Sequence, residues 1–429
     1  MRPLLALSAL AMLSLIPPTC FAQNSQPMTL KEAEQIAIQN HPQIQAATQL
    51  AAAARAQVKE VRSVYYPQAF GSATGAVAEN NSRIAAGALN NPIVYDRYAN
   101  GVRVSQLVSD FGRTHELAKS SNLHSQAQQE NVTATRADVL LQVDQAFFGV
   151  LRAKAVLRVA QETVKNRQLV ADQVTALAKN QLKSDLDVSF ANVNLAQAGL
   201  LLIQAQNDIQ ASYAELSTAL GYPDQRTIEP ADEPMPSAPP SDVAPLIQQA
   251  LRDRPELIGQ RLDVDSAKSY VAAERDLWMP TISAIGAAGI VPYREEPLAS
   301  RYSAAAFNVN IPIFNGHLYG ALRNEADARA RAQEQYLRDT QDRIVRDVRT
   351  SWLNANSGFQ RLSVTNQLLQ EATQALKLAQ ARYKLGLGSI VELSQAQLGI
   401  TQAQIEQASA KYDYETQLSL LNFQLGALH

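Results

Sequence analysis

The chain has 429 residues, 46% of them hydrophobic and 18% charged, and its formal net charge at pH 7 is -2. This balance, with no basic stripe, argues against a nucleic-acid-binding protein. The only cysteine is Cys20. If the N-terminal segment that contains Cys20 is removed on export, the remaining protein has no cysteine. Its stability would then come from packing, without disulfides.

The N-terminus has the pattern of a secretory signal peptide, residues 1–22. Arg2 precedes an apolar run from Leu4 to Ile16, and Cys20-Phe21-Ala22 provides a cleavage site. That run is too short for a membrane anchor, and we expect no transmembrane helix later, for want of about 20 consecutive apolar residues. Lipidation of Cys20 is the less favoured alternative, because Pro17-Pro18-Thr19 does not resemble the box of a lipoprotein.

The first structural repeat, residues 23–222, begins with a predicted helix. The helix starts at the capping box Thr29-Leu30-Lys31-Glu32 and runs to about Val64, where Tyr65-Tyr66-Pro67 ends it. Two strands with weak alternation, 67–77 and 98–108, follow within residues 67–110.

A proline-free segment from Arg113 to Tyr222, rich in Ala, Gln and Leu, predicts long helices. The first, running to about Asn180, would measure roughly 100 Å and must pack along its length. After a turn near residues 180–187, a returning helix ends at Leu220-Gly221, where glycine suits the C-cap. Because the returning helix is shorter, we expect the N-terminal helix of the repeat to stack end to end on it.

Residues 223–241, rich in proline and acidic side chains, predict an extended, stiff linker rather than a packed element. Beyond it, residues 242–429 form a second structural repeat. The matched pairs, at constant spacing, include Val143 with Val348, Phe147 with Trp352, Asp187 with Glu392, Leu220 with Leu425, and Gly221 with Gly426. The duplication indicates one architecture built from two halves.

The second repeat predicts the same elements again. A helix runs from Ser241 or Asp242 to about Leu277, and strands 281–291 and 302–313 follow within residues 280–314. The second long helix turns near residues 384–392 and shows a heptad stripe typical of a coiled coil: Leu369, Ala372, Leu376, Ala379 and Tyr383. The first repeat has Arg167 in this stripe where the second has Ala372.

Four strands in one chain are too few for a closed barrel, and an open sheet edge cannot sit in lipid. Membrane insertion would therefore require several chains, and three chains would supply twelve strands. The alternative is a small soluble sheet that caps a helical body. The predicted secretion signal and the short strands with small residues favour the barrel.

The ordered set of motifs resembles the TolC-like outer membrane efflux protein family over the whole mature chain. The resemblance rests on Asn40-His41-Pro42-Gln43-Ile44, on the junction Gln106–Gly112 with its echo Ile311–Gly316, and on Ala381–Gly386 through Glu392–Ala396. It implies a mainly α fold with a small β part: long coiled-coil helical hairpins and four strands per chain. It also implies a homotrimer with a twelve-stranded β-barrel in outer membrane lipid and an α-helical tunnel in the periplasm.

The resemblance further implies a gate at the tunnel tip. By matching position, Asp187 and Tyr383 would be link residues, Glu392 would supply an acidic ring, and Gln395 stands where a second acidic residue occurs in the family. This chain departs from the family at Gly388, where a basic residue can occur, and at Gln181, which replaces a turn glycine.

Each of these residues also has a purely structural interpretation. Asp187 and Glu392 are equally well explained as acids favoured at helix N-termini, and Tyr383 as a heptad core residue. His41 and His317 have no partner at metal-ligand spacing.

We therefore expect the outer membrane channel component of a tripartite efflux or type I secretion system, a passive export duct for small molecules. Its partners would be a periplasmic adaptor protein and an inner membrane pump. The alternative is a secreted coiled-coil scaffold or adhesin without a pore. With no catalytic constellation, we expect neither an enzyme nor a cofactor or metal. The residues leave open whether the cargo is a drug, a metal, a solvent or a polypeptide.

Overall fold

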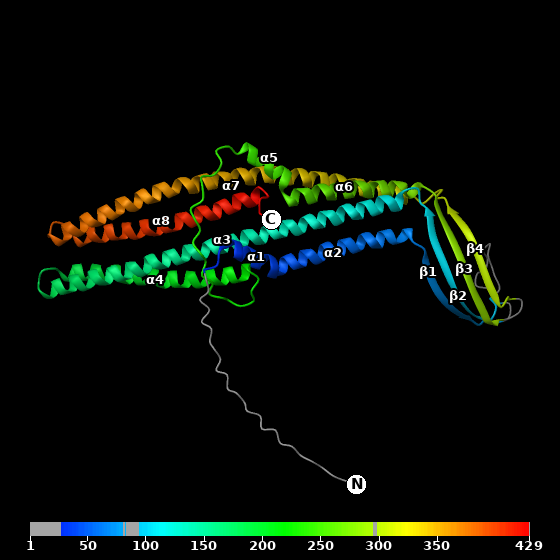
Figure 1. The fold of residues 1–429 in the computed structure, drawn as a ribbon, viewed down its shortest axis with the longest axis horizontal. Coiled ribbons are helices and arrows are strands. Elements are labelled where there is room, and N and C mark those ends of the chain that lie inside the picture. The colour runs from blue at the N-terminus through cyan, green and yellow to red at the C-terminus, as the bar shows by residue number, and fades with distance from the viewer. Residues whose placement is uncertain (1–26, 80–81, 83–93, 295–297, 429) are drawn as a thin grey trace, which may run out of the picture.

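The computed structural model describes residues 27–79, 82, 94–294 and 298–428; the predicted signal peptide, residues 1–22, lies outside them. The molecule is a long rod with a β-sheet at one end and two helical turns at the other (Figure 1). Long helices can form here because their segments contain no proline.

The two repeats contain the same elements in the same order. The first comprises α1 (Leu30–Asn40), α2 (Pro42–Arg62), β1 (Gln68–Ala76), β2 (Arg97–Ser109), α3 (Arg113–Lys179) and α4 (Asp185–Ala219). The second comprises α5 (Ala244–Asp253), α6 (Pro255–Arg275), β3 (Thr281–Arg294), β4 (Arg301–Asn310), α7 (Leu318–Lys384) and α8 (Ile390–Gln424). Both α3 and α7 have 67 residues, and both α4 and α8 have 35, so the predicted duplication extends to element lengths.

The prediction of one continuous N-terminal helix in each repeat is wrong, because a proline divides it. His41 and Arg254 both adopt extended backbone angles, with ψ of 124° and 121°, between α1 and α2 and between α5 and α6. The ring of the following proline disfavours the helical conformation at these residues, and proline has no N–H to donate. His41 then caps α2, since its Nδ1 accepts a hydrogen bond from the Gln43 N–H at 3.3 Å.

The returning helices end against these breaks, which confirms the predicted end-to-end stacking (Figure 1). A Cβ atom added at Gly221 would lie 3.0 Å from the carbonyl of Asn40. One added at Gly426 would lie 3.1 Å from Asp253, so the same contact recurs in the second repeat. Both glycines also have positive φ, 79° and 71°.

We expect Gly221→Ala to destabilise the helical body by roughly 2 kcal/mol, because it combines a left-handed backbone with a backbone clash. Gly199→Ala is the matched control: a Cβ added at Gly199, inside α4, would meet no described atom within 4 Å apart from the adjacent chain and the backbone of its own helix, and alanine there should stabilise by about 0.5 kcal/mol. Denaturant unfolding followed by far-ultraviolet circular dichroism compares the two. Equal midpoints would contradict the end-on contact.

The four strands form one antiparallel sheet in the order β1-β2-β3-β4, so β2 and β3 join the two repeats. Gly101 and Gly289 are register partners at this junction. They leave space for the ring of Tyr302, whose hydroxyl a Cβ at either position would overlap. Strands β1 and β4 form the two outer edges, and every residue of β4 is exposed.

Helix α3 is the element on which both repeats pack. Towards the sheet it contacts α2 and α6, and towards the turns it contacts α4 and α8. The main core lies at mid-length around Phe147, Val143 and Leu216, and its counterpart in the second repeat contains Val348 and Leu421. The equivalent residues of the duplication therefore occupy equivalent core positions.

The linker between the repeats is extended, as predicted, but the prediction that it is not packed is wrong. Ile228 is buried in the main core, and Met28 forms a parallel bridge with Pro230. Further along, Trp352 Nε1 donates to the carbonyl of Pro240 at 2.8 Å, and Lys411 pairs with Asp232 at 2.7 Å. An extended chain cannot satisfy its own backbone groups, so these helices bind it.

Within the described ranges, one helix, α4, is long and apolar enough to cross a membrane by length and composition alone. It contains no run of about 20 consecutive apolar residues, because polar side chains such as Asn194, Gln197 and Gln204 interrupt its apolar segments. In the structure α4 packs along α3. Its other side carries exposed apolar residues: Leu186, Val193, Leu200 and Ile203.

Candidate functional site at the helical tip

The two turns at the tip have the same backbone design. Gln181 and Gly386, equivalent in the duplication, take the left-handed conformation with φ of 60° and 72°. In both turns a backbone N–H returns to the last helical turn: Leu182 to the Leu177 carbonyl, and Leu387 to the Arg382 carbonyl. This is the Schellman arrangement that satisfies carbonyls at a helix end. Gln181, which stands where the family has a turn glycine, therefore leaves the geometry of the first turn the same as that of the second.

Both predicted acidic residues lie in the first turn of a returning helix for a local reason. Ser184 Oγ accepts from the Asp187 N–H at 3.2 Å, and Ser389 Oγ accepts from the Glu392 N–H at 3.1 Å. Serine is a favoured N-cap, and a carboxylate in the first turn interacts well with the helix dipole. In the first repeat the Ser184 N–H also donates to Asp187 at 3.0 Å, which completes a capping box.

The structure brings Asp187 and Tyr383 together. The Tyr383 hydroxyl donates to Asp187 Oδ1 at 3.4 Å, so the end of α7 in the second repeat is joined to the start of α4 in the first. The Lys183 ammonium lies 3.8 Å from the centre of the Tyr383 ring, a cation–π contact. Tyr383 is also part of the buried cluster between the hairpins, so its structural interpretation holds as well.

The electrostatics of this pair favour a charged acceptor and a neutral donor. Burial opposes the ionisation of Asp187, yet hydrogen bonds from Ser184, with Lys183 and Tyr383 nearby, hold its pKa below the ordinary value. Burial and the adjacent Asp187 charge raise the pKa of Tyr383 to about 12. At neutral pH Tyr383 therefore remains a hydrogen-bond donor to a carboxylate.

Glu392 and Gln395 lie apart from that pair. Glu392 is exposed and forms an ion pair with Arg382, Nε to Oε1 at 2.9 Å, while Arg382 also donates to the Leu387 carbonyl at 3.1 Å. The glycine at 388 matters here, because a Cβ there would lie 3.0 Å from Glu392 Oε2. Gln395 is exposed one turn further along α8.

Sequence reasoning missed Arg382. Its signal was available: a basic residue in the last turn of α7, facing an acidic residue in the first turn of α8 across a short connection. Because both side chains are substantially exposed, this pair contributes little to stability by itself.

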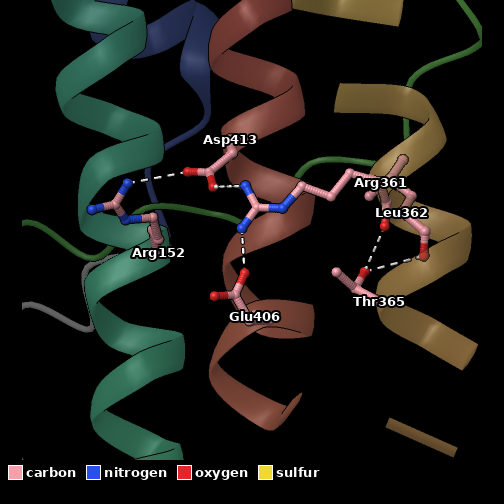
Figure 2. A network of polar contacts seen from close by, with 6 residues as sticks. All are labelled: Arg152, Arg361, Leu362, Thr365, Glu406 and Asp413. Carbon is pink, nitrogen blue, oxygen red and sulfur yellow. Dashed lines mark hydrogen bonds and ion pairs between the residues drawn. The ribbon is translucent and has the colours of Figure 1, made fainter. Parts of the chain in front are cut away.

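A second polar network joins the hairpins at mid-length (Figure 2). Asp413 of α8 accepts from Arg152 of α3 at 3.1 Å and from Arg361 of α7 at 3.2 Å, and Arg361 also pairs with Glu406 of α8. One carboxylate thus connects the two repeats. In the described part of the chain, no group of His, Cys, Asp or Glu could hold a metal ion.

Two buried carboxylates lie close to this level of the rod. Asp144 of α3 is 2% exposed and Glu415 of α8 is 4% exposed. Burial, with Glu34 nearby, raises the pKa of Asp144 to about 7, although Ser419 opposes the shift. Burial likewise raises the pKa of Glu415 to about 7, despite the proximity of Lys411.

The fold and the tip define a class: chains with two long helical hairpins, a small open sheet and a tip where the hairpins are linked. A family model described as "Outer membrane efflux protein" matches residues 34–222 and 246–427. The chain belongs to this outer membrane efflux protein family.

Individual relatives agree with the family match. Outer membrane protein TolC of Escherichia coli K12 is 22% identical over 95% of this chain and 84% of its own length. The alkaline protease secretion protein AprF of Pseudomonas aeruginosa is 24% identical over 93% of this chain and 84% of its own. The cation efflux system protein CusC of E. coli K12 is 23% identical over 88% and 81%.

Solved structures show the same fold. A crystal structure of CusC matches with a TM-score of 0.81 at 20% identity, covering 92% of each chain. The outer membrane protein VceC of Vibrio cholerae matches with a TM-score of 0.79 at 18% identity, covering 92% of this chain and 96% of its own. The chain is thus an outer membrane channel component of the efflux and secretion type, which favours the export duct over the pore-free scaffold.

Proposed function

We propose that three copies of this chain form one continuous export duct. The observation that carries the proposal is the open four-stranded sheet, in which no other described strand pairs with the outer edge of β1 or of β4. In a membrane such edges must be paired, because lipid offers no hydrogen bonds. Joining β4 of one copy to β1 of the next closes a barrel of twelve strands, four from each of three copies.

The helical body supports the same assembly. On α4, Leu186, Val193 and Leu200 are exposed at heptad spacing, with 64%, 53% and 68% of their surface accessible. A heptad stripe of leucine and valine buries well against a second helix, and the residues of α4 that are buried within the chain, such as Ala191 and Ala198, lie outside this stripe. We assign this stripe to the neighbouring copy, so that three hairpin pairs surround a tunnel.

The tip is the gate of this duct in our proposal. Closure depends on the link from Tyr383 to Asp187, because it holds the end of α7 to the start of α4. Opening separates these groups when a periplasmic adaptor and an inner membrane pump engage the tip. Cargo then passes from pump to medium inside the tube, driven by the pump. Glu392 and Gln395 line the passage, with the charge of Glu392 partly neutralised by Arg382.

We expect the full-length chain to fractionate with the outer membrane and to run as a trimer after gentle detergent extraction. Planar bilayers containing the purified protein should show a small, steady closed-state ion current.

The double substitution Leu186→Glu with Leu200→Glu on the α4 stripe should abolish the trimer, because it places charges where the neighbouring copy would bury apolar side chains. Extraction of the unsubstituted chain as a soluble monomer without current would instead support the secreted scaffold.

A further inference from the structure

Arg167 of α3 is a buried cation held by neutral groups. It occupies the heptad stripe at the position that Ala372 holds in the second repeat, and it is only 7% exposed. Its Nη2 donates to the Gln397 carbonyl at 2.6 Å and to Thr401 Oγ1 at 3.3 Å, both on α8. Among the residues that the structure describes, no carboxylate forms an ion pair with this guanidinium.

Within the described part of the chain, this arrangement leaves the charge of Arg167 uncompensated. Burial lowers its pKa to about 10, so the group stays positive at neutral pH. A guanidinium has five N–H donors, and the two neutral acceptors on α8 occupy only Nη2. Buried charges are normally paired, because an isolated one is costly to remove from water.

A cavity of about 470 Å³ lies beside Arg167, between α3, α7 and α8 on the tip side of the rod. Its apolar wall includes Val170, Leu177, Leu376, Leu393 and Ile400. The charged residues that line it are all cationic: Arg167, Lys183 and Lys384. Its volume lies in the range of small-molecule sites. Its lining combines apolar side chains with positively charged ones.

We propose that this cavity binds a small amphipathic anion, a carboxylate or sulfonate carried on an apolar body, with the anionic group accepting a hydrogen bond from Nε or Nη1 of Arg167. Both edges of the guanidinium that offer two parallel N–H donors include Nη2, which α8 already occupies, so the anion accepts one charge-assisted hydrogen bond from the cation. The apolar body lies against the leucine and isoleucine side chains of the wall. Lys183 is partly engaged already by the Tyr383 ring, so Arg167 is the principal contact.

Binding would also act on the gate. Tyr383 forms part of the cavity wall, and the cavity exists only while α3 packs against α7 and α8. A ligand that binds only this arrangement stabilises it by RT ln(1 + L/Kd), where L is the free ligand concentration, so the effect grows with that concentration. The occupied site therefore favours the closed tip; this consequence rests on the proposed gate, whereas binding itself does not.

The test uses the full-length protein in nanodiscs of zwitterionic lipid, titrated calorimetrically with 2-naphthoate. We expect saturable binding with at most one site per chain, and at least about tenfold weaker binding by the uncharged 2-naphthamide, as for the loss of a charge-assisted hydrogen bond. Arg167→Ala should weaken naphthoate binding by a similar factor. Arg158→Ala, at an exposed position of the same helix, should leave it unchanged.

Arg167→Ala introduces the residue that the second repeat has at the equivalent position, Ala372, so the helix packing should tolerate it. Arg167→Gln serves as a second variant. Circular dichroism verifies that each variant is folded. Naphthoate binding that is absent, equal to that of the amide, or unaffected in both variants would overturn the proposal. The proposal would also be overturned if the Arg167 variants weakened the trimer but left naphthoate binding unchanged. That result would mean that a neighbouring chain supplies the negative charge that pairs with Arg167.

Discussion

Tyr383→Phe should raise the closed-state conductance of the channel in planar bilayers, and Asp187→Ala combined with Tyr383→Phe should raise it further. The phenylalanine removes only the hydroxyl that donates to Asp187, while the ring keeps its place in the tip core. A hydrogen bond to a charged group contributes about 1.5 kcal/mol or more. At 3.4 Å this O–H···O contact is longer than usual, so its loss in each chain shifts the open-to-closed ratio by up to roughly tenfold.

Tyr383→Phe alone tests the hydrogen bond to Asp187 without disturbing the N-terminal cap of α4. Asp187→Ala alone also removes the capping box that Asp187 forms with Ser184, so its effect combines two losses. Tyr336→Phe is the matched control, since Tyr336 is an exposed tyrosine on the same helix, 61% accessible. A closed-state conductance unchanged in Tyr383→Phe and in the double variant would refute the assignment of these residues to the gate.

Acidity should act on this link in one direction. The pKa of Asp187 is lower in the folded protein than in the unfolded chain. The stability that ionised Asp187 contributes is therefore complete at pH values above its unfolded-state pKa, and it is lost as the pH falls through its folded-state pKa. The link therefore persists at neutral pH and weakens only in strong acid.

Asp144→Asn should stabilise the protein at pH 8 by roughly 1 to 3 kcal/mol and change stability little at pH 4. The folded-state pKa of Asp144 is raised to about 7, so its stabilising contribution is fully present below the unfolded pKa and is lost as pH rises through about 7. The wild type consequently has a buried carboxylate ionised at pH 8, with Oδ1 lacking a hydrogen-bond partner among the described residues. The amide of asparagine removes that charge at nearly the same volume.

Glu415→Gln should behave in the same way, since burial also raises the pKa of Glu415 to about 7. Its ammonium neighbour Lys411, 4.0 Å away, makes the expected gain smaller than for Asp144. Denaturant unfolding at pH 4, 6 and 8 measures the profile. Asp208→Asn, at an exposed position of α4, is the control and should stay within about 0.5 kcal/mol of wild type throughout. A pH-independent gain in Asp144→Asn would contradict the titration of this residue.

The residue pattern was informative where one local cause dominates. The absence of proline predicted the long helices, and the duplication predicted that α3 and α7 share one length. It was misleading at His41-Pro42 and Arg254-Pro255, where a proline between helical segments divides the helix. Both prolines are suited to position N1, so each helix resumes immediately after the break.

The candidate site was predictable in part. The pairing of Tyr383 with Asp187 was expected from the family resemblance, because helix periodicity alone says nothing about which residues meet across two hairpins. The pair of Arg382 with Glu392 spans only a short turn, so its opposite charges were visible in the sequence, but the space left by the missing Cβ at Gly388 was not. The cavity at Arg167 required α3 of the first repeat to pack against α7 and α8 of the second, which are distant from it in sequence.

By itself, the amino-acid sequence determined the helices and strands, the twofold repetition and the membership of a family of export channels, because these depend on local backbone rules and on recurrence along the chain. Only the tertiary structure decided which charges are buried, at Arg167, Asp144 and Glu415, and which residues bind the linker. Burial depends on what packs opposite a residue, and in this rod the opposite residue almost always belongs to another helix, often to the other repeat.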